Sequence, residues 1–471
     1  MTDRVSTGAH RLDSLLGGGL PRHAINLVVG PPGSGKTILA QQCLYANADQ
    51  QRPAVYLSTV SEPLEKIVRF GQSLTFFDPE AIGSKVFYED LGGLLGEQEL
   101  TGVLDRIRAI IREHNPGIMV IDSFKALRPY AGGAGDFRRF LHTLTGLLSA
   151  VPVTSIWVGE YDANERVTAP EFAVADAIIS LGSTVAAERT VRTLHVLKLR
   201  GGDFRSGEHT YRISADGVAA FPRLADPFAY SSTPYTLEAR RISSGVEALD
   251  DMLAEGYWRG AATLVAGPTG AGKTLIGLHF AFAGARRGEP VVIATLQEDP
   301  TQLERIVQRF GWSVKDDNIT LLYRSPVDLY IDEWVYDVLD TVERAGAQRV
   351  LIDSLGDLQA ASPDLVRFRE YVYSLLHRFS RAGVSVIMTY EIPELSRASR
   401  LSEYGASHLS DNVVLLQYRG LDEDTVRRTL TVLKTRASSH DPRVHEFDIS
   451  TDGIVLHRGD QPTGVPADDH G

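Results

Sequence analysis

The sequence predicts an α/β fold made of two tandem domains, each a mostly parallel sheet flanked by helices. Three observations predict it. A glycine-rich motif, G-x-x-x-x-G-K-[ST], occurs at residues 30–37 and again at residues 267–274. Matching features of the two halves lie at a nearly constant distance along the chain. Within each half, short apolar runs alternate with helical patterns, which is the order of strands and crossover helices in a parallel sheet.

The two glycine-rich motifs have the form of phosphate-binding loops, and each follows an apolar run of strand type, at residues 25–29 and 262–266. In such a loop the glycines let backbone N–H groups close around phosphate oxygens. The lysine neutralises the outer phosphates and the threonine hydroxyl reaches Mg²⁺. One match can arise by chance, whereas two in matched contexts indicate a duplicated ATP-binding module. The predicted ATP-binding residues are Gly30, Pro31, Pro32, Gly33, Ser34, Gly35, Lys36, Thr37, Gly267, Pro268, Thr269, Gly270, Ala271, Gly272, Lys273 and Thr274, with Lys36 and Lys273 also assigned to catalysis.

The spacing of equivalent residues tests the duplication. Five unrelated pairs are separated by 231 to 237 positions, which indicates two copies of one fold with small loop differences. The pairs are Gly30 and Gly267, Glu62 and Glu298, Asp122 and Asp353, Asp176 and Asp411, and Lys198 and Lys434. We therefore expect an N-terminal domain at residues 1–225, a linker at 226–238, a C-terminal domain at 239–458 and a flexible tail at 459–471.

Short apolar runs mark the expected strands. In the first copy they lie at residues 54–59, 118–122, 153–159, 177–181 and 191–199. Apolar side chains at helical spacing in residues 137–148 and 365–379 are assigned to the core. The late runs at 191–199 and 429–433 are expected to extend each sheet through a hairpin.

An aspartate ends one apolar strand in each copy, Asp122 and Asp353. Ligands of α/β proteins bind at the carboxyl ends of the strands, and a P-loop site needs a second carboxylate on the metal side. These aspartates are therefore predicted to hold Mg²⁺ through water. The predicted metal ligands are Thr37, Asp122, Thr274 and Asp353.

A glutamate follows the strand after each P-loop helix. Glu62 and Glu298 lie 26 and 25 residues after the loop lysines. A carboxylate at this strand tip can face the γ-phosphate and serve the attacking water, so both are predicted catalytic residues. The alternative is that each glutamate is the N-cap or a first-turn acid of the next helix. Glu160 and Glu391 end two further strands, as phosphate sensors or as surface carboxylates.

Composition narrows the class of protein. The chain has 471 residues, a formal net charge of −12 and one cysteine, Cys43, so an internal disulfide is impossible. The N-terminus has no secretory signal pattern and no stretch has the length of a membrane span, which favours a cytoplasmic protein. The negative charge argues against a sequence-independent nucleic-acid binder.

The motifs resemble those of the KaiC-like family of tandem-domain ATPases, a branch of the RecA superfamily, over about residues 4–458. Besides both loops, the resemblance is carried by the Ser-Thr-Gly and Ser-Ser-Gly openings at 6–8 and 243–245, the two Ile-Asp-Ser strand ends, the Arg-Phe-Gly runs at 69–71 and 309–311, the strand at 411–418, and Lys-x-Arg at 198–200 and 434–436. It implies two RecA-like P-loop NTPase domains in a homohexamer of stacked rings, with ATP at subunit interfaces. Lys198, Arg200, Lys434 and Arg436 would then reach the γ-phosphate bound by a neighbouring subunit, and His440 matches the histidine that continues the pattern.

The chain departs from the family pattern at residues that bear on phosphorylation. The family has paired glutamates where this chain has Ser61-Glu62 and Gln297-Glu298. The phosphoacceptor Ser-Thr pair of the second domain falls on Ser407-His408, which leaves Ser407 as the candidate acceptor and Ser410 as a weaker one.

Three functions remain open on the sequence. The first is a self-assembling ATPase that acts as a signalling or clock-type switch with signalling proteins as partners; Ser/Thr autophosphorylation in the second domain would be a further activity. The second is a RecA- or RadA-like DNA-dependent ATPase of recombination or repair. That reading is favoured by Lys125, Arg128, Arg138 and Arg139 but opposed by the acidic run at 355–359. The third is a scaffold that uses ATP only for assembly.

Overall fold

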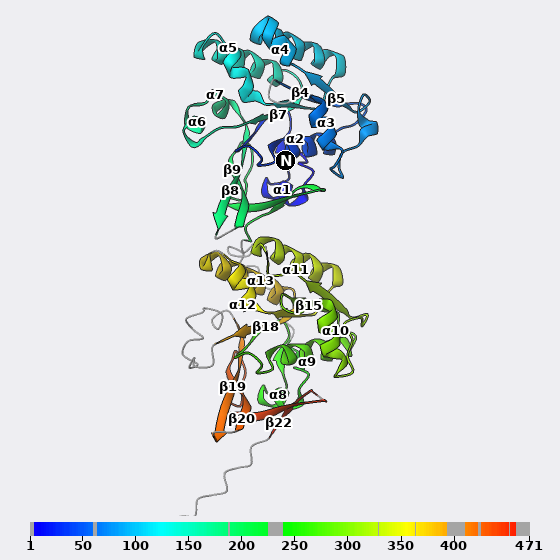
Figure 1. The fold of residues 1–471 in the computed structure, drawn as a ribbon, viewed down its shortest axis with the longest axis vertical. Coiled ribbons are helices and arrows are strands. Elements are labelled where there is room, and N and C mark those ends of the chain that lie inside the picture. Colours follow the sequence, from blue (N-terminus) through cyan, green and yellow to red (C-terminus); the bar gives the residue numbers. More distant parts are fainter. Residues whose placement is uncertain are drawn as a thin grey trace, which may run out of the picture. The chain divides into compact units, whose positions relative to one another are not determined.

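The computed structural model describes residues 4–59, 64–186, 189–224, 239–327, 329–362, 364–392, 410–422, 425–451 and 453–457. The chain divides into two compact units, Met1–Arg223 and Leu224–Gly471 (Figure 1). The expected linker and tail lie outside the described residues. Among the described helices, none is both long and apolar enough to cross a lipid bilayer.

A nine-stranded sheet forms the centre of the first unit, in the order β11-β10-β9-β8-β3-β7-β6-β4-β5. The strands from β8 to β5 pair in parallel, whereas β9, β10 and β11 add an antiparallel edge. The elements are β1 (Arg4–Val5), α1 (His10–Leu15), β2 (Leu20–Pro21), β3 (Ile25–Val29), α2 (Lys36–Ala46), β4 (Ala54–Ser58), α3 (Leu64–Gly71), η1 (Pro79–Ala81), β5 (Val86–Asp90), α4 (Gly92–His114), β6 (Ile118–Asp122), η2 (Phe124–Tyr130), α5 (Ala134–Ser149), β7 (Thr154–Gly159), α6 (Ala163–Thr168), α7 (Pro170–Val174), β8 (Ala177–Ala186), β9 (Arg189–Leu199), β10 (His209–Ser214) and β11 (Gly217–Phe221).

The second unit repeats this architecture, with the strand order β16-β15-β17-β18-β14-β19-β20-β21-β22. Here β14 is the central strand, between β18 and β19. The elements are β12 (Arg241–Ile242), α8 (Glu247–Met252), β13 (Tyr257–Trp258), β14 (Ala262–Gly267), α9 (Lys273–Ala285), β15 (Val291–Thr295), α10 (Pro300–Gln308), β16 (Ile319–Tyr323), α11 (Ile331–Ala345), β17 (Arg349–Asp353), α12 (Leu355–Ala361), α13 (Leu365–Arg381), β18 (Ser385–Glu391), β19 (Asn412–Asp422), β20 (Thr425–Thr435), β21 (His445–Ser450) and β22 (Gly453–Leu456).

Each sheet is covered on both faces, which explains why its central strands are buried along their whole length and are mostly apolar. Successive side chains of one strand point to opposite faces, so Leu27 and Val28 of β3 belong to different core clusters. Figure 1 shows α4 and α5 on one side of the first sheet and α1 and α2 on the other. In the second unit α11 and α13 lie opposite α8 and α9.

The predicted fold class is confirmed: each unit is a mostly parallel sheet flanked by helices. The expected hairpins are present as β8–β9 and β19–β20. The edge strands β5 and β16 and the last pairs, β10–β11 and β21–β22, were not predicted. Most of β5 and β16 is only partly buried, so these strands lack the continuous apolar run that marks the central ones.

A buried ion pair distinguishes the second unit from the first. The Arg349 side chain, at the start of β17, is 1% exposed and donates from Nε to the Glu289 Oε2 at 2.6 Å. Its Nη1 also donates to the backbone carbonyls of Ser243 and Phe280. The matching positions of the first unit hold Ile118 in place of the arginine and Arg52 in place of the glutamate.

The helix after each P-loop is tied to the last strand of its own sheet by a buried polar side chain. In the first unit Gln42 accepts from the Val218 backbone N–H at 2.7 Å and donates back to the Val218 carbonyl at 3.3 Å. In the second unit the matching residue is His279, whose Nε2 lies 3.2 Å from the Ile454 N–H. This nitrogen can accept only while the ring is neutral.

We expect the second unit to lose stability as the pH falls below neutrality, because His279 resists protonation. Burial, as the largest cause, lowers the His279 pKa from its ordinary 6.5 to about 4. A group with a depressed pKa contributes fully above the unfolded pKa, and the contribution is lost as the pH falls from about 6.5 towards 4. The loss is roughly 3 kcal/mol over this window.

Urea unfolding at pH 7 and pH 5, followed by tryptophan fluorescence, measures this effect. Trp312 is a local reporter because its ring packs edge-on against His279. His279→Gln copies the side chain of the first unit and should remove most of the pH dependence. An unchanged dependence in that variant would show that other groups cause it.

Candidate active site

Both P-loops lie at the carboxyl end of the central strand of their sheet. The first connects β3 to α2 and the second connects β14 to α9. The last glycine before each helix is in the left-handed region, with φ of +88° at Gly35 and +104° at Gly272. A side chain at either position would be strained, so glycine is required for the loop to enter the helix. The helix N-termini therefore point their backbone N–H groups and positive dipole ends at the loops.

The loop lysines are held inside the loops. Lys36 donates to the Pro31 carbonyl at 2.8 Å, and Lys273 donates to the Pro268 carbonyl at 2.8 Å. Burial lowers the pKa of Lys273. Lys36 also forms an ion pair of 3.3 Å with Glu160 at the end of β7.

The carboxylates that end β7 and β18 both contact a P-loop. In the second unit Glu391 accepts from the Thr269 hydroxyl at 2.6 Å instead of contacting the lysine. Both carboxylates are exposed at the surface and both contact a P-loop, so the two expectations for them, phosphate sensor and surface carboxylate, stay open.

The threonine of each loop contacts the aspartate that ends β6 or β17, the strand two places from the central strand of its sheet. Thr37 Oγ1 donates to Asp122 Oδ2 at 2.7 Å, and Thr274 Oγ1 donates to Asp353 Oδ2 at 2.8 Å. Both aspartates are buried, and burial raises the pKa of Asp353, while its hydrogen bonds oppose the shift.

A hydroxyl beside a carboxylate is a hard-oxygen donor set that suits Mg²⁺, which keeps waters and phosphate oxygens as its other ligands. Across the described residues there is no group of three or more His, Cys, Asp or Glu side chains that could hold a metal alone. The donor set therefore fits a metal that arrives with a phosphate substrate.

Glu298 lies beside this pair in the second unit. It is half-buried, and its Oε2 is enclosed without a hydrogen-bond partner. Burial, followed by the negative charge of Asp353, raises the Glu298 pKa. The N-cap alternative is wrong for this residue, because Asp299 caps α10 by accepting from the N–H groups of Thr301 and Gln302. Glu62 lies outside the described residues.

In the first unit a cavity of about 880 Å³ opens at the P-loop. Its lining includes Lys36 and Thr37 of the loop, Asp122 at the end of β6 and Glu160 directly after β7, so four predicted or candidate residues face one space. The lining also includes Arg192 of β9, whose Nη1 donates to the Gly33 carbonyl at 2.8 Å.

Sequence reasoning missed this arginine and its counterpart. Arg428 of β20 donates to the Gly270 carbonyl at 3.4 Å. The signal was present: the two arginines are 236 positions apart, at the same offset as the other matched pairs.

Comparison with known proteins agrees with this geometry. The family model "ATPase: KaiC" matches residues 5–225 and 242–461, which is one match for each half of the chain. The chain belongs to the KaiC ATPase family. It is 29% identical to the circadian clock protein KaiC3 of Synechocystis sp., with 96% of this chain and 92% of that protein covered. It is also 29% identical to the circadian clock oscillator protein KaiC of Picosynechococcus sp., with 96% and 89% covered.

The Lys-x-Arg pairs of the KaiC-like pattern lie at the amino ends of the parallel strands, whereas the P-loop of the same unit lies at their carboxyl ends. Arg200 forms an ion pair of 3.2 Å with Asp176, which lies beside Ile25 at the start of β3. Arg436 pairs with Asp411 at 3.4 Å in the same place beside β14. A strand of five residues in the first unit and of six in the second, roughly 15–20 Å long, separates each arginine from the loop of its own unit. These residues therefore cannot serve the loop of their own domain.

The lysines of the two pairs donate hydrogen bonds to backbone carbonyls at the same amino ends of the strands. Lys198 donates to the carbonyls of Phe172 and Ala173, and Lys434 donates to the Ser410 carbonyl at 2.7 Å. Burial lowers the pKa of both lysines. Ser410 is wholly buried at this edge, so it lies away from the P-loop of its own unit. His440 follows β20, whereas Ser407 and His408 lie outside the described residues.

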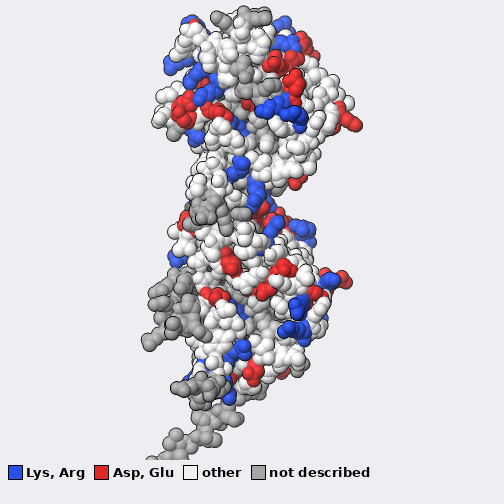
Figure 2. Space-filling model, in the orientation of Figure 1, with Lys and Arg blue, Asp and Glu red and all other residues white. Residues whose placement is uncertain are grey.

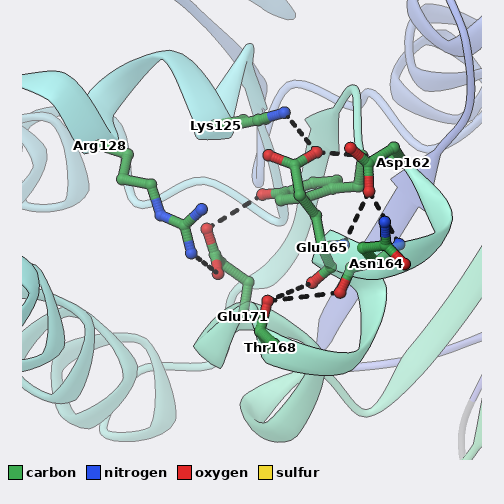
Figure 3. A network of polar contacts seen from close by, with 8 residues as sticks. Lys125, Arg128, Asp162, Asn164, Glu165, Thr168 and Glu171 are labelled. Carbon is green, nitrogen blue, oxygen red and sulfur yellow. Dashed lines mark hydrogen bonds and ion pairs between the residues drawn. The ribbon is translucent and has the colours of Figure 1, made fainter.

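Three of the four basic residues named after Asp122 lie beside carboxylates, namely Lys125, Arg128 and Arg139. Figure 3 shows Lys125 and Arg128 of η2 facing α6 and α7. Lys125 forms an ion pair of 2.7 Å with Glu165, and Arg128 lies 3.9 Å from the fully buried Glu171. Arg139 pairs with Asp136. On the face that Figure 2 shows, basic and acidic side chains of the first unit lie among one another. Both observations disfavour a DNA-binding groove formed by these residues.

Proposed function

We propose that the protein is a cytoplasmic ATPase with two active sites per chain. It assembles into a homohexamer of stacked rings and works as a signalling or clock-type switch. The observation that carries the proposal is the threonine–aspartate hydrogen bond beside the P-loop lysine, which occurs in both units. Membership of the KaiC ATPase family supports ATP as the nucleotide. The names of the two relatives support a role connected with a clock.

In this proposal the N–H groups of each loop and the loop lysine hold the phosphates of ATP. Thr37 with Asp122, and Thr274 with Asp353, would hold Mg²⁺, which supplies positive charge to the β- and γ-phosphate oxygens. The water oxygen forms a bond to the γ-phosphorus while the bond to the bridging oxygen breaks, and ADP leaves with that electron pair. The proton of the water passes to Glu298 in the second unit and to Glu62 in the first.

The raised pKa of Glu298 suits it to this task. A carboxylate that is harder to ionise is a stronger base once it is ionised, so it takes a proton more readily near neutral pH. The Oε2 of Glu298 is enclosed without a hydrogen-bond partner, so no protein donor occupies this acceptor. The residue is therefore our choice for the catalytic base of the second site.

The position of the Lys-x-Arg pairs supports the proposed assembly. Arg200 and Arg436 lie at the amino ends of the parallel strands, away from the P-loop of their own unit. In a ring they would complete the site of an adjacent subunit. The four trans-acting residues in the proposal are Lys198, Arg200, Lys434 and Arg436, with His440 beside the second pair. We place ATP at the interfaces between subunits for this reason.

Autophosphorylation is a narrower part of the proposal. Ser407 would be the acceptor in the second ring, and Gln297 replaces the family glutamate that would take its proton. We therefore expect hydrolysis to dominate over transfer to the protein.

Incubation of the purified chain with ATP and Mg²⁺ tests the function directly. We expect release of phosphate, a mass in solution that rises to six chains when ATP is present, and little phosphate on Ser407 by mass spectrometry. A chain that stays monomeric and releases no phosphate would refute the proposal. Strong, salt-sensitive stimulation by single-stranded DNA would favour the recombination-type ATPase instead.

A further inference from the structure

The second active site contains a carboxylate that has no counterpart in the first. Asp357 lies in the first turn of α12, four residues after Asp353. The matching residue of the first unit is Ala126, four residues after Asp122, and Ala126 lines the cavity at the P-loop. By this equivalence Asp357 lies in the wall of the second nucleotide site.

Asp357 holds the side chain of Gln297. The Gln297 Nε2 donates to Asp357 Oδ2 at 2.8 Å, and the same oxygen accepts from the Ser354 hydroxyl at 2.5 Å. The Ser354 Oγ also accepts from the Asp357 backbone N–H at 3.3 Å, which makes Ser354 the N-cap of α12. The three side chains therefore support one another at the end of β17.

This contact determines which way the Gln297 amide faces. A carboxylate can only accept, so the amide must present its nitrogen to Asp357 and turn its carbonyl oxygen elsewhere. Within the described part of the chain, no hydrogen bond to the Gln297 Oε1 is recorded. That oxygen remains available to accept from a water, which is the role that a glutamine has in P-loop GTPases.

We propose that Asp357 is a positioning residue of the second ATPase site, which locks Gln297 so that its carbonyl oxygen orients the attacking water for Glu298. The inference rests on the proposed ATPase function. It gives the glutamine of the second site a part in hydrolysis. In this proposal Asp357 acts through Gln297, whose Nε2 donates to its Oδ2, and Glu298 takes the proton.

Steady-state hydrolysis in the Lys36→Ala background isolates the second site. We expect Asp357→Ala to lower kcat by about ten- to a hundredfold, the range that misplacement of a catalytic group costs, with KM unchanged. Asp357→Asn should restore most of kcat, because the asparagine carbonyl can still accept from Gln297. Gln297→Ala should lower kcat by the same factor as Asp357→Ala. The double variant should be no slower than either single variant, since both changes remove the same interaction. Asp317→Ala, at an exposed acid of the same unit, is the matched control.

Three results would overturn the inference while leaving the function intact: full kcat in Asp357→Ala, an Asp357→Asn variant as slow as Asp357→Ala, or additive effects in the double variant. Binding of ADP with aluminium fluoride, a mimic of the transferring phosphoryl group, gives a readout that needs no turnover. Asp357→Ala should weaken it by the same factor as kcat and leave ADP binding unchanged. An unaltered chain that binds neither ADP nor the mimic would overturn the proposed function, and this inference with it.

Discussion

Replacing both loop lysines, Lys36→Ala with Lys273→Ala, should abolish phosphate release. Lys36 is buried in its loop and Lys273 is partly buried in its own. Each is the charge that the outer phosphates would meet, so its loss removes a preorganised donor worth about 10²–10³ in rate at each site. Each single variant should retain the turnover of the other site. Phosphate release under saturating ATP gives all three rates.

Lys66→Ala and Lys315→Ala are the controls for this experiment, because both lysines are exposed and outside the loops. They should hydrolyse ATP like the unaltered chain. A double loop variant with normal turnover would show that the two loops are not the active sites.

Replacing the arginines of both Lys-x-Arg pairs, Arg200→Ala with Arg436→Ala, should slow hydrolysis by about 10³–10⁵-fold. This is the range measured for arginines supplied by a neighbouring molecule. Folding should be nearly unaffected, because each arginine is more than half exposed and its ion pair is at the surface. The slow rate should persist at any ATP concentration, since the phosphates are still held by the loop.

Mixing the double lysine variant with the double arginine variant tests whether these arginines act between subunits. The double lysine variant and the double arginine variant are both expected to be inactive alone. When they assemble together, some interfaces join an intact loop from one subunit to an intact arginine from the other, and activity should return. Arg443→Ala, at an exposed arginine near the second pair, is the control. A mixture that stays inactive, although mass measurement shows mixed rings, would contradict the trans role.

The sequence predicted those parts of the site whose functional residues follow directly after a recognisable strand in the chain. The sequence predicted the loops and the aspartates that end β6 and β17, because the polar residue that ends a buried strand lies at the carboxyl end of the sheet, where ligands bind. The structure brings Thr37 to Asp122, and Thr274 to Asp353, as that reasoning implies.

Other parts of the site depend on contacts between distant segments. Gln297 meets Asp357 only because β15 pairs with β17 in a register that sets Thr295 opposite Asp353. Arg192 reaches the first loop because β9 folds back on β8. Neither contact leaves a pattern within a short window of sequence, so the pairing of the strands had to be known first.

The buried arginine of the second unit has a consequence for how this duplicated chain reaches its native state. Two similar sheets form from one polypeptide, and pairing of a strand from one copy with the sheet of the other is a characteristic error of repeat proteins. If β17 took the place of β6, Arg349 would lie buried beside Arg52 instead of Glu289. An unpaired buried charge costs several kcal/mol, so this exchange is strongly disfavoured. The single charge at the start of β17 thus disfavours the pairing of this strand with the sheet of the first unit.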